Sequence, residues 1–243
     1  MEAITGLIAT NNAGVVKEPR GFIKILQFII AIFAFATTCG YSGSTEFKVT
    51  CNNTETQTRK ISFEYPFRIN AEEIKVPICG AADKTVHPWG DFKAPAEFYV
   101  FVGVMAFLYC IAAVILYVFF DDHYRKNDKI PIADFIVSVV LTVLWLIGSC
   151  VWAQGIADIR SYTDPAEVYR LHIPECRGPN PLKCEVTDSG NYAGLFVSIM
   201  FGFLNLFVWI GNLWFLFKET AWFKVRQKPA EEPVGVDPSQ VQV

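Results

Sequence analysis

Cysteines and a glycosylation triplet are the residues of this 243-residue chain whose chemistry is most easily assigned. Four of the seven cysteines lie in two long polar segments, Cys51 and Cys79 in the first and Cys176 and Cys184 in the second. Four such cysteines allow three pairings, and we favour one disulfide within each segment, which requires an oxidising compartment. Directly after the first of them, Asn52 begins an Asn-x-Thr triplet and is a predicted N-glycosylation site.

Side chains suited to catalysis or metal binding are scarce. The three histidines, His87, His123 and His172, all lie outside the long apolar segments of the chain, and no nucleotide-binding loop, zincin motif or nucleophile elbow occurs. The net charge of −3, from 21 basic and 24 acidic residues, gives no sign of nucleic-acid binding. We therefore expect a protein that is not an enzyme, without a metal, a catalytic cofactor or a nucleic-acid partner.

The apolar residues are clustered into four spans. Hydrophobic residues make up 52% of the chain and charged residues 19%, where soluble domains have about a quarter charged residues. The spans are 22–40, 98–120, 132–152 and 193–217, and each is near or above the roughly 20 residues that cross a bilayer. Buried helices of a soluble core are the alternative, which four such runs disfavour. The first span also resembles a signal peptide, but its length and the basic tail 1–21 before it favour a retained helix.

Basic residues near the span ends predict the topology. Those before the first span, between the second and third, and after the fourth include Lys17, Arg20, Lys24, Arg125, Lys126, Lys129, Lys218 and Lys224. Residues 1–21, the short connection 121–131 and residues 218–243 are therefore predicted to be cytoplasmic. The two long loops, 41–97 and 153–192, are predicted to be luminal, in agreement with their cysteines and the glycosylation triplet.

The two long loops carry different local patterns. Apolar and polar residues alternate in 47–51, 61–65 and 74–78, which predicts short half-buried strands forming a small β-rich luminal sheet stapled by a disulfide. A flexible glycosylated loop is the alternative. Residues 153–161 are predicted to extend the third span as a helix, and 174–184 to be turn-like. The tail 218–243, rich in Pro, Glu and Gln, is predicted to be disordered.

Small and polar residues form one stripe on each predicted helix. In the fourth span the stripe falls within roughly 80° of a helical wheel and comprises Gly194, Ser198, Gly202, Asn205 and Asn212. Because lipid provides little hydrophobic drive between helices, close packing and side-chain hydrogen bonds must join them. The stripes predict an all-α membrane domain, a four-helix bundle with large aromatics facing lipid, the two asparagines linking helices, and a seam for packing or for a partner helix. No span has an acid at mid-depth, which disfavours an ion relay.

Longer motifs resemble the synaptophysin family. They include KEPRGF at 17–22, FEYPFR at 63–68 and FGFLNL at 201–206, followed by GNLWF at 211–215. In order they cover residues 16–222, and the four loop cysteines stand where the family places them. The resemblance implies a tetraspan protein with a MARVEL-type bundle, and the short tail, without tyrosine after Tyr192, sets the chain apart from synaptophysin itself.

The family resemblance also implies a function. It implies a multi-pass protein of cytoplasmic or synaptic-like vesicles that takes part in trafficking and exocytosis, with a synaptobrevin-like v-SNARE, cholesterol and further copies of the chain as partners. A loose sterol-contact pattern at the end of the second span, Val118, Tyr124 and Lys126, suggests where cholesterol binds. An oligomeric channel or transporter, and a structural protein of membrane junctions as in the mitsugumin branch, are the alternatives.

Overall fold

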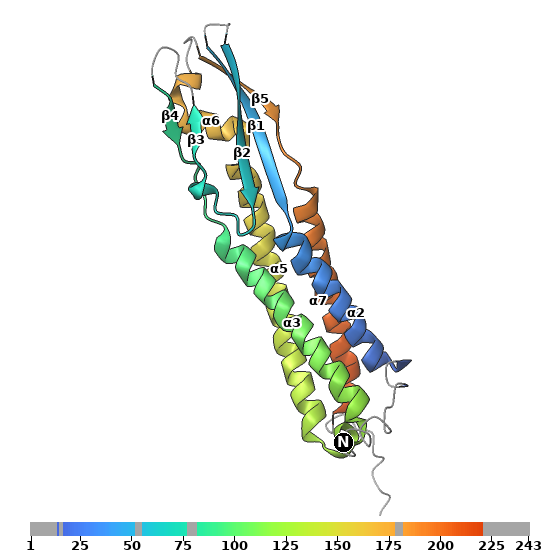
Figure 1. Ribbon diagram of the computed structural model, residues 1–243. Coiled ribbons are helices and arrows are strands. Elements are labelled where there is room, and N and C mark those ends of the chain that lie inside the picture. Colours follow the sequence, from blue (N-terminus) through green and yellow to red (C-terminus); the bar gives the residue numbers. More distant parts are fainter. Residues whose placement is uncertain (1–13, 15–16, 52–54, 77–81, 178–181, 221–243) are drawn as a thin grey trace, which may run out of the picture.

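Four long helices form an elongated bundle in the computed structural model, which describes residues 14, 17–51, 55–76, 82–177 and 182–220, the Arg125 side chain excepted (Figure 1). They are α2 (Pro19–Cys39), α3 (Lys93–Phe119), α5 (Lys129–Tyr162) and α7 (Ala193–Glu219). Among the described residues these four helices are long and apolar enough to cross a membrane. The four predicted spans and the helical extension of the third are confirmed. The predicted tail disorder falls mostly outside the described residues.

The helix ends differ from the predicted span ends for local reasons. Helix α2 begins at Pro19, three residues before the predicted span, because a proline at the first helical position already has a helical φ and needs no N–H partner. Helix α3 begins at Lys93, five residues before its span, and ends at Phe119. A short helix, α4 (Asp121–Lys126), then connects α3 to α5.

The four helices are arranged in a ring. Helix α2 packs against α3 and α7, and α5 packs against the same two helices from the opposite side. We call the end of the bundle that carries α4 the connection end, and the opposite end, which carries the strands, the sheet end (Figure 1). The start of α2 and the end of α7 both lie at the connection end, as an even number of long helices in the bundle requires.

A three-stranded antiparallel sheet covers the sheet end. Its order is β2 (Glu55–Glu64), β1 (Ser42–Cys51) and β5 (Leu182–Asp188), and a separate hairpin pairs β3 (Ile74–Val76) with β4 (Lys84–Val86). The strands predicted in residues 41–97 are confirmed. The turn-like prediction for 174–184 is wrong in part, because β5 begins at Leu182 and adds an edge strand to the sheet.

A second small core lies under the sheet. Phe47, Val49 and Ile61 from the strands pack with Val168 of helix α6 (Pro165–His172) and with Ile173. The predicted disulfide between Cys176 and Cys184 is present and links the 3-10 turn Pro174–Arg177 to β5. Cys51 is also disulfide-bonded. Its predicted partner Cys79 and the predicted glycosylation site Asn52 lie outside the described residues.

The expectation that large aromatics face lipid is wrong for three tryptophans and two tyrosines of the long helices, whereas Trp214 and Tyr162 are exposed. Trp145, Trp152, Trp209, Tyr99 and Tyr117 are buried in the bundle, whereas the exposed aromatic rings on the helices are mostly phenylalanines. The Trp152 indole N–H donates to Ser198 Oγ at 2.9 Å, and the Tyr99 hydroxyl donates to the Ser198 carbonyl at 2.6 Å. Hydrocarbon offers no water to bond, so an inward position is favoured for rings such as Trp152 and Tyr99 whose polar atom finds a partner there.

Candidate functional site

The predicted seam of α7 lies inside the bundle. Ser198, Gly202, Asn205 and Asn212 are buried, and Gly194 is half-buried. A Cβ on Gly202 would stand 2.6 Å from the Tyr99 hydroxyl and 2.8 Å from Ser149 Oγ. The glycine therefore makes room for side chains of α3 and α5, and the seam is occupied by the chain's own helices.

The two asparagines do not link helices through hydrogen bonds as predicted. Asn205 Oδ1 accepts from the Trp209 indole at 3.1 Å, on the same helix, and neither amide atom of Asn212 has a hydrogen-bond partner among the described residues. Ser198 makes the interhelical bonds instead. The Ser198 hydroxyl also donates to the Leu195 carbonyl of its own helix, so its donor is satisfied within α7. The small side chain leaves room for the large rings beside it.

Buried charges near the connection end form a cluster that the sequence reasoning missed. We call it the connection-end cluster, and its members are Arg20, Lys24, Tyr109, Tyr117, Asp121, Tyr124, Asp134 and Ser138. Lys24 is 0% exposed and Asp134 7% exposed, although the sequence analysis counted Lys24 only as a basic residue near a span end. Charged groups inside a membrane domain are costly unless they are paired, so their partners decide what the cluster does.

The Lys24 ammonium is surrounded by hydrogen-bond acceptors and the faces of aromatic rings. Its Nζ is 3.6 Å from Asp134 Oδ1 and 3.3 Å from Ser138 Oγ. The same atom lies 4.5 Å from the ring centre of Tyr109 and 5.3 Å from that of Trp209. An ammonium over aromatic faces is stabilised by their quadrupoles, most strongly where water is excluded. The ammonium therefore joins α2 to α3, α5 and α7 at one point.

Asp134 collects three tyrosine hydroxyls. Tyr109 and Tyr117 donate to its two carboxylate oxygens, and Tyr124 from α4 donates to Oδ2 at 3.2 Å. Arg20 lies one turn before Lys24 on α2 and forms a second buried ion pair, with its guanidinium 2.7 Å from Asp121. The Arg20 guanidinium also lies over the rings of Tyr117 and Tyr124, at 5.5 and 5.4 Å. The two ion pairs and the three tyrosines thus fasten α2, α3, α4 and α5 together.

The arrangement favours a structural role for the cluster. Each cationic group has an anionic partner, and within the described ranges no group of three His, Cys, Asp or Glu residues is placed to hold a metal ion. The sequence did contain a signal for the cluster. On α2 two basic residues share a 4-3-4-3-4 spacing, which is typical of one helix face, with small and polar residues, and this pattern indicates that they face the bundle. The six residues on that face are all buried: Arg20, Lys24, Gln27, Ala31, Ala34 and Thr38.

The predicted sterol-contact residues do not form one surface. Tyr124 is buried and points to Asp134, whereas the Lys126 side chain is 80% exposed and lies 4.0 Å from Asp122. A different feature faces the membrane nearby, an apolar groove of about 280 Å³ between α2 and α3. We call it the α2–α3 groove, and its lining residues are Ile25, Phe28, Cys110, Ile111, Val114 and Ile115.

The outward face of α7 carries a second regular stripe. Met200, Leu204, Phe207, Gly211 and Trp214 follow one another at 4-3-4-3 spacing, and we call them the outer stripe. Met200 and Phe207, at 71% and 67%, are the two most exposed large apolar side chains on the four long helices. A Cβ on Gly211 would meet no atom within 4 Å. Unlike Gly202, this glycine has nothing packed against it in the described part of the chain.

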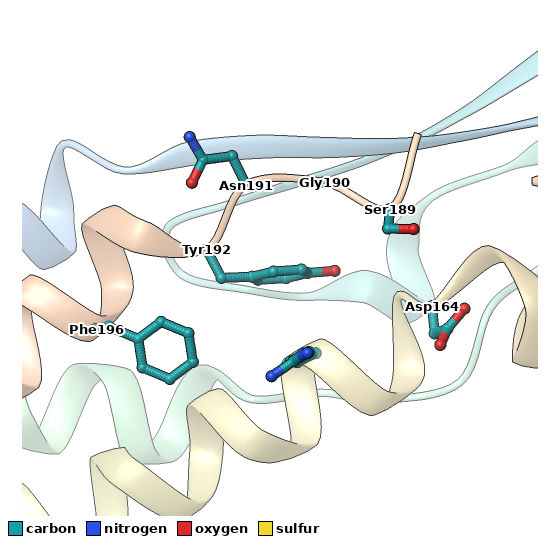
Figure 2. A pocket seen from close by; sticks show the side chains of 7 residues that line it. Asp164, Ser189, Gly190, Asn191, Tyr192 and Phe196 are labelled. Carbon is teal, nitrogen blue, oxygen red and sulfur yellow. The ribbon is translucent and has the colours of Figure 1, made fainter. Parts of the chain in front are cut away.

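A polar pocket of about 420 Å³ opens where α5 and α7 reach the sheet end (Figure 2). Its lining residues are Arg160, Asp164, Ser189, Gly190, Asn191, Tyr192 and Phe196. Tyr192 forms its wall, because the ring stacks on Phe63 and the hydroxyl lies 2.7 Å from Thr163 Oγ1. Burial raises the pKa of Tyr192, so the hydroxyl stays neutral at physiological pH. We call this the sheet-end pocket.

Comparison with known families accounts for most of the chain. Residues 15–215 match the MARVEL family, which is described as a membrane-associating domain. The match includes all four long helices but the last turn of α7, and both sheets of the sheet end. The predicted fold class, a four-helix membrane bundle with a small disulfide-containing strand region, agrees with the family match and the structure.

Proposed function

The chain belongs to the MARVEL family of membrane-associating domains, an integral membrane family, and we propose that it organises the membrane of trafficking vesicles. In this proposal it is not an enzyme, and it acts in exocytosis by binding a v-SNARE helix and cholesterol on the outside of its bundle. The motifs at 17–22, 63–68 and 201–215 support placing it in the synaptophysin branch of the family. Because the interior is filled by the chain's own side chains, partners within the membrane must bind outside.

The outer stripe of α7 is the observation that carries this proposal. Helices that pair in membranes use small residues, at which two backbones approach closely, between larger side chains at heptad spacing. Gly211 is such a residue, and it lies between Phe207 and Trp214 with open space at its Cβ position. The stripe therefore suits one further membrane-spanning helix. The family resemblance supports a synaptobrevin-like v-SNARE as the protein that supplies it.

Co-purification tests the helix partner. The full chain, extracted in mild detergent with a synaptobrevin-like v-SNARE, should recover that SNARE, and Gly211→Leu should reduce recovery because the side chain fills the contact. Val104→Leu, on the exposed face of α3, is the control and should leave recovery unchanged. Equal recovery with Gly211→Leu refutes docking on α7, and recovery of only a second copy of the chain assigns the stripe to homo-oligomerisation.

Cholesterol is proposed to bind in the α2–α3 groove. The groove is lined by apolar side chains and opens between two membrane-spanning helices, which suits the flat ring system of a sterol. Val114→Trp should fill the groove and reduce labelling by a photoreactive sterol. Val140→Trp, on the exposed face of α5, is the matched control. Equal labelling of both variants would place the sterol elsewhere.

Orientation and location form the last part of the proposal. The connection end carries exposed lysines, Lys126 and Lys129, and the sheet end carries the disulfide, which supports cytoplasmic termini and a luminal sheet end. Glycosidase treatment should increase gel mobility of the wild type, and Asn52→Gln should abolish the shift. Immunogold labelling should find the protein on vesicles, whereas labelling of apposed cisternae would favour a junctional role.

A further inference from the structure

The sheet-end pocket has two opposite charges, one of which has no partner. We propose that it binds the headgroup of a zwitterionic phospholipid, with the phosphate at Arg160 and the headgroup amine at Asp164. Among the residues that the structure describes, the Arg160 guanidinium forms neither a hydrogen bond nor an ion pair. One carboxylate oxygen of Asp164 accepts from the Ala166 amide at 2.9 Å and caps α6, and this leaves its other oxygen for a ligand.

The depth of the pocket matches the headgroup region of a bilayer. On α7 the exposed apolar side chains run from Phe196 to Phe215, a rise of 19 residues or about 29 Å, close to the thickness of a hydrocarbon core. The hydrogen bond from Trp152 of α5 to Ser198 of α7 shows that these two residues lie at about the same depth along the bundle axis. Arg160 lies eight residues beyond Trp152, and Phe196 two residues before Ser198, so the Arg160 Cα stands about 9 Å outside the apolar edge. Because helical side chains tilt toward the helix N-terminus, the guanidinium reaches back from there toward the membrane. Headgroups occupy roughly the first 5–8 Å there.

The order of the lining residues matches the order of groups in the lipid. Figure 2 shows Phe196, the Tyr192 ring and then Asp164 and Ser189 in order along the pocket. Arg160 also lines the pocket and precedes Asp164 by four residues, so it lies closer to the bundle. A phospholipid presents its acyl chain, its phosphate and its amine in the same order. Phe196, which is half-exposed, suits the chain, and a guanidinium can bond two phosphate oxygens at once. Asp164 then faces the amine.

The walls of the pocket are held in place before any lipid binds. Gly190 has a φ of +78°, and a Cβ there would lie 2.8 Å from Thr45 Cγ2, so the 189–192 turn requires glycine. The Tyr41 hydroxyl donates to the Asn191 carbonyl at 2.6 Å and ties the same turn to the end of α2. A rigid pocket loses little conformational entropy on binding, which favours one headgroup geometry over others.

Native mass spectrometry of the full chain in detergent tests the assignment. The probes are phosphatidylcholine, whose quaternary ammonium can pair with Asp164 by charge, phosphatidylglycerol, which has the phosphate but no cationic nitrogen, and diacylglycerol, which has neither. Wild type should retain phosphatidylcholine most strongly and diacylglycerol least. Arg160→Gln should reduce retention of both phospholipids about tenfold, the loss of one charge-assisted contact. Asp164→Asn keeps the helix cap, since asparagine caps as well as aspartate, and should abolish the preference for phosphatidylcholine.

A matched control and a soluble probe complete the design. Arg170→Gln removes an exposed arginine that pairs with Glu167 outside the pocket, and it should leave retention of all three lipids unchanged. Equal lipid retention by Arg160→Gln and wild type overturns the proposal. Soluble phosphocholine that binds as tightly as the lipid overturns the lipid as its source, whereas weak or absent binding supports it.

Discussion

The ion pair between Lys24 and Asp134 gives the sharpest prediction about this fold. Asp134→Asn removes the negative charge and keeps one side-chain oxygen for the tyrosine hydroxyls, while its NH2 can donate to a hydroxyl at the position of the other oxygen. Lys24 then remains in a site where its side chain has no exposed surface. At 3.6 Å the attraction amounts to about 4.6 kcal/mol for an effective dielectric constant of 20. Removing one partner of such a pair typically costs 3–5 kcal/mol, because the other charge is left buried.

The double variant separates the charge from the packing. Lys24→Met keeps the length of the side chain and removes its charge, so Lys24→Met with Asp134→Asn leaves no unpaired charge in the bundle. The double variant should be more stable than Asp134→Asn alone, with a coupling of about 2 kcal/mol or more between the two positions. If Lys24 acts only through packing, each substitution should lower the stability independently. The double variant should then be less stable than Asp134→Asn alone.

Unfolding of the purified chain in mixed micelles, by stepwise addition of sodium dodecyl sulfate, measures these free energies. Asp122→Asn is the matched control, because it removes a carboxylate from an exposed pair with Lys126 and should change stability by less than about 0.5 kcal/mol. If Asp134→Asn unfolds at the same detergent fraction as wild type, the cluster does not hold the helices together and the reasoning fails.

Three further perturbations test packing, the disulfide and the sheet end. Gly202→Ala should cost about 1–3 kcal/mol through overpacking in the same unfolding assay. Cys176→Ala with Cys184→Ala should lower the stability of the sheet end by about 2.5 kcal/mol, the loop entropy of an eight-residue separation, read from hydrogen exchange. Burial lowers the pKa of His172 below 6.5, because the folded sheet end favours the neutral imidazole. The sheet end should therefore keep its full stability above pH 6.5 and lose part of it as the pH falls below that value. Fluorescence of Trp89, which contacts His172, should report that loss, and His172→Gln should remove it.

The sequence predicted the helices well because lipid leaves little choice of backbone structure. Every backbone N–H and C=O in hydrocarbon must be bonded within the segment, so a long apolar run is a helix almost by necessity. The strands of residues 41–97 were predictable because their alternation reflects one buried face. Strand β5 was not, since of its seven residues only Leu182 is buried, and an edge strand with one buried residue has no alternation to detect.

The connection-end cluster was missed because the topology rule counts basic residues without asking where they point. Arg20 and Lys24 contributed to a correct count of basic residues near a span end, yet both side chains turn into the bundle. Their partners on other helices, Asp121 and Asp134, lie about 100 residues away along the chain. The face that they share with Gln27 was readable, but the pairing itself depends on how the helices pack.

The same packing determines where this protein can bind anything. Large rings and paired charges fill the centre of the bundle, so the small residues that first suggested a docking seam, such as Gly202, are already in contact with the chain's own side chains. The glycine with open space around it, Gly211, lies on the outer stripe of α7 instead. The α2–α3 groove and the sheet-end pocket are likewise on the outside, on other faces or at another depth. Variants at one of these places should therefore leave binding at the other two unchanged, which makes the helix, sterol and headgroup proposals separable by experiment.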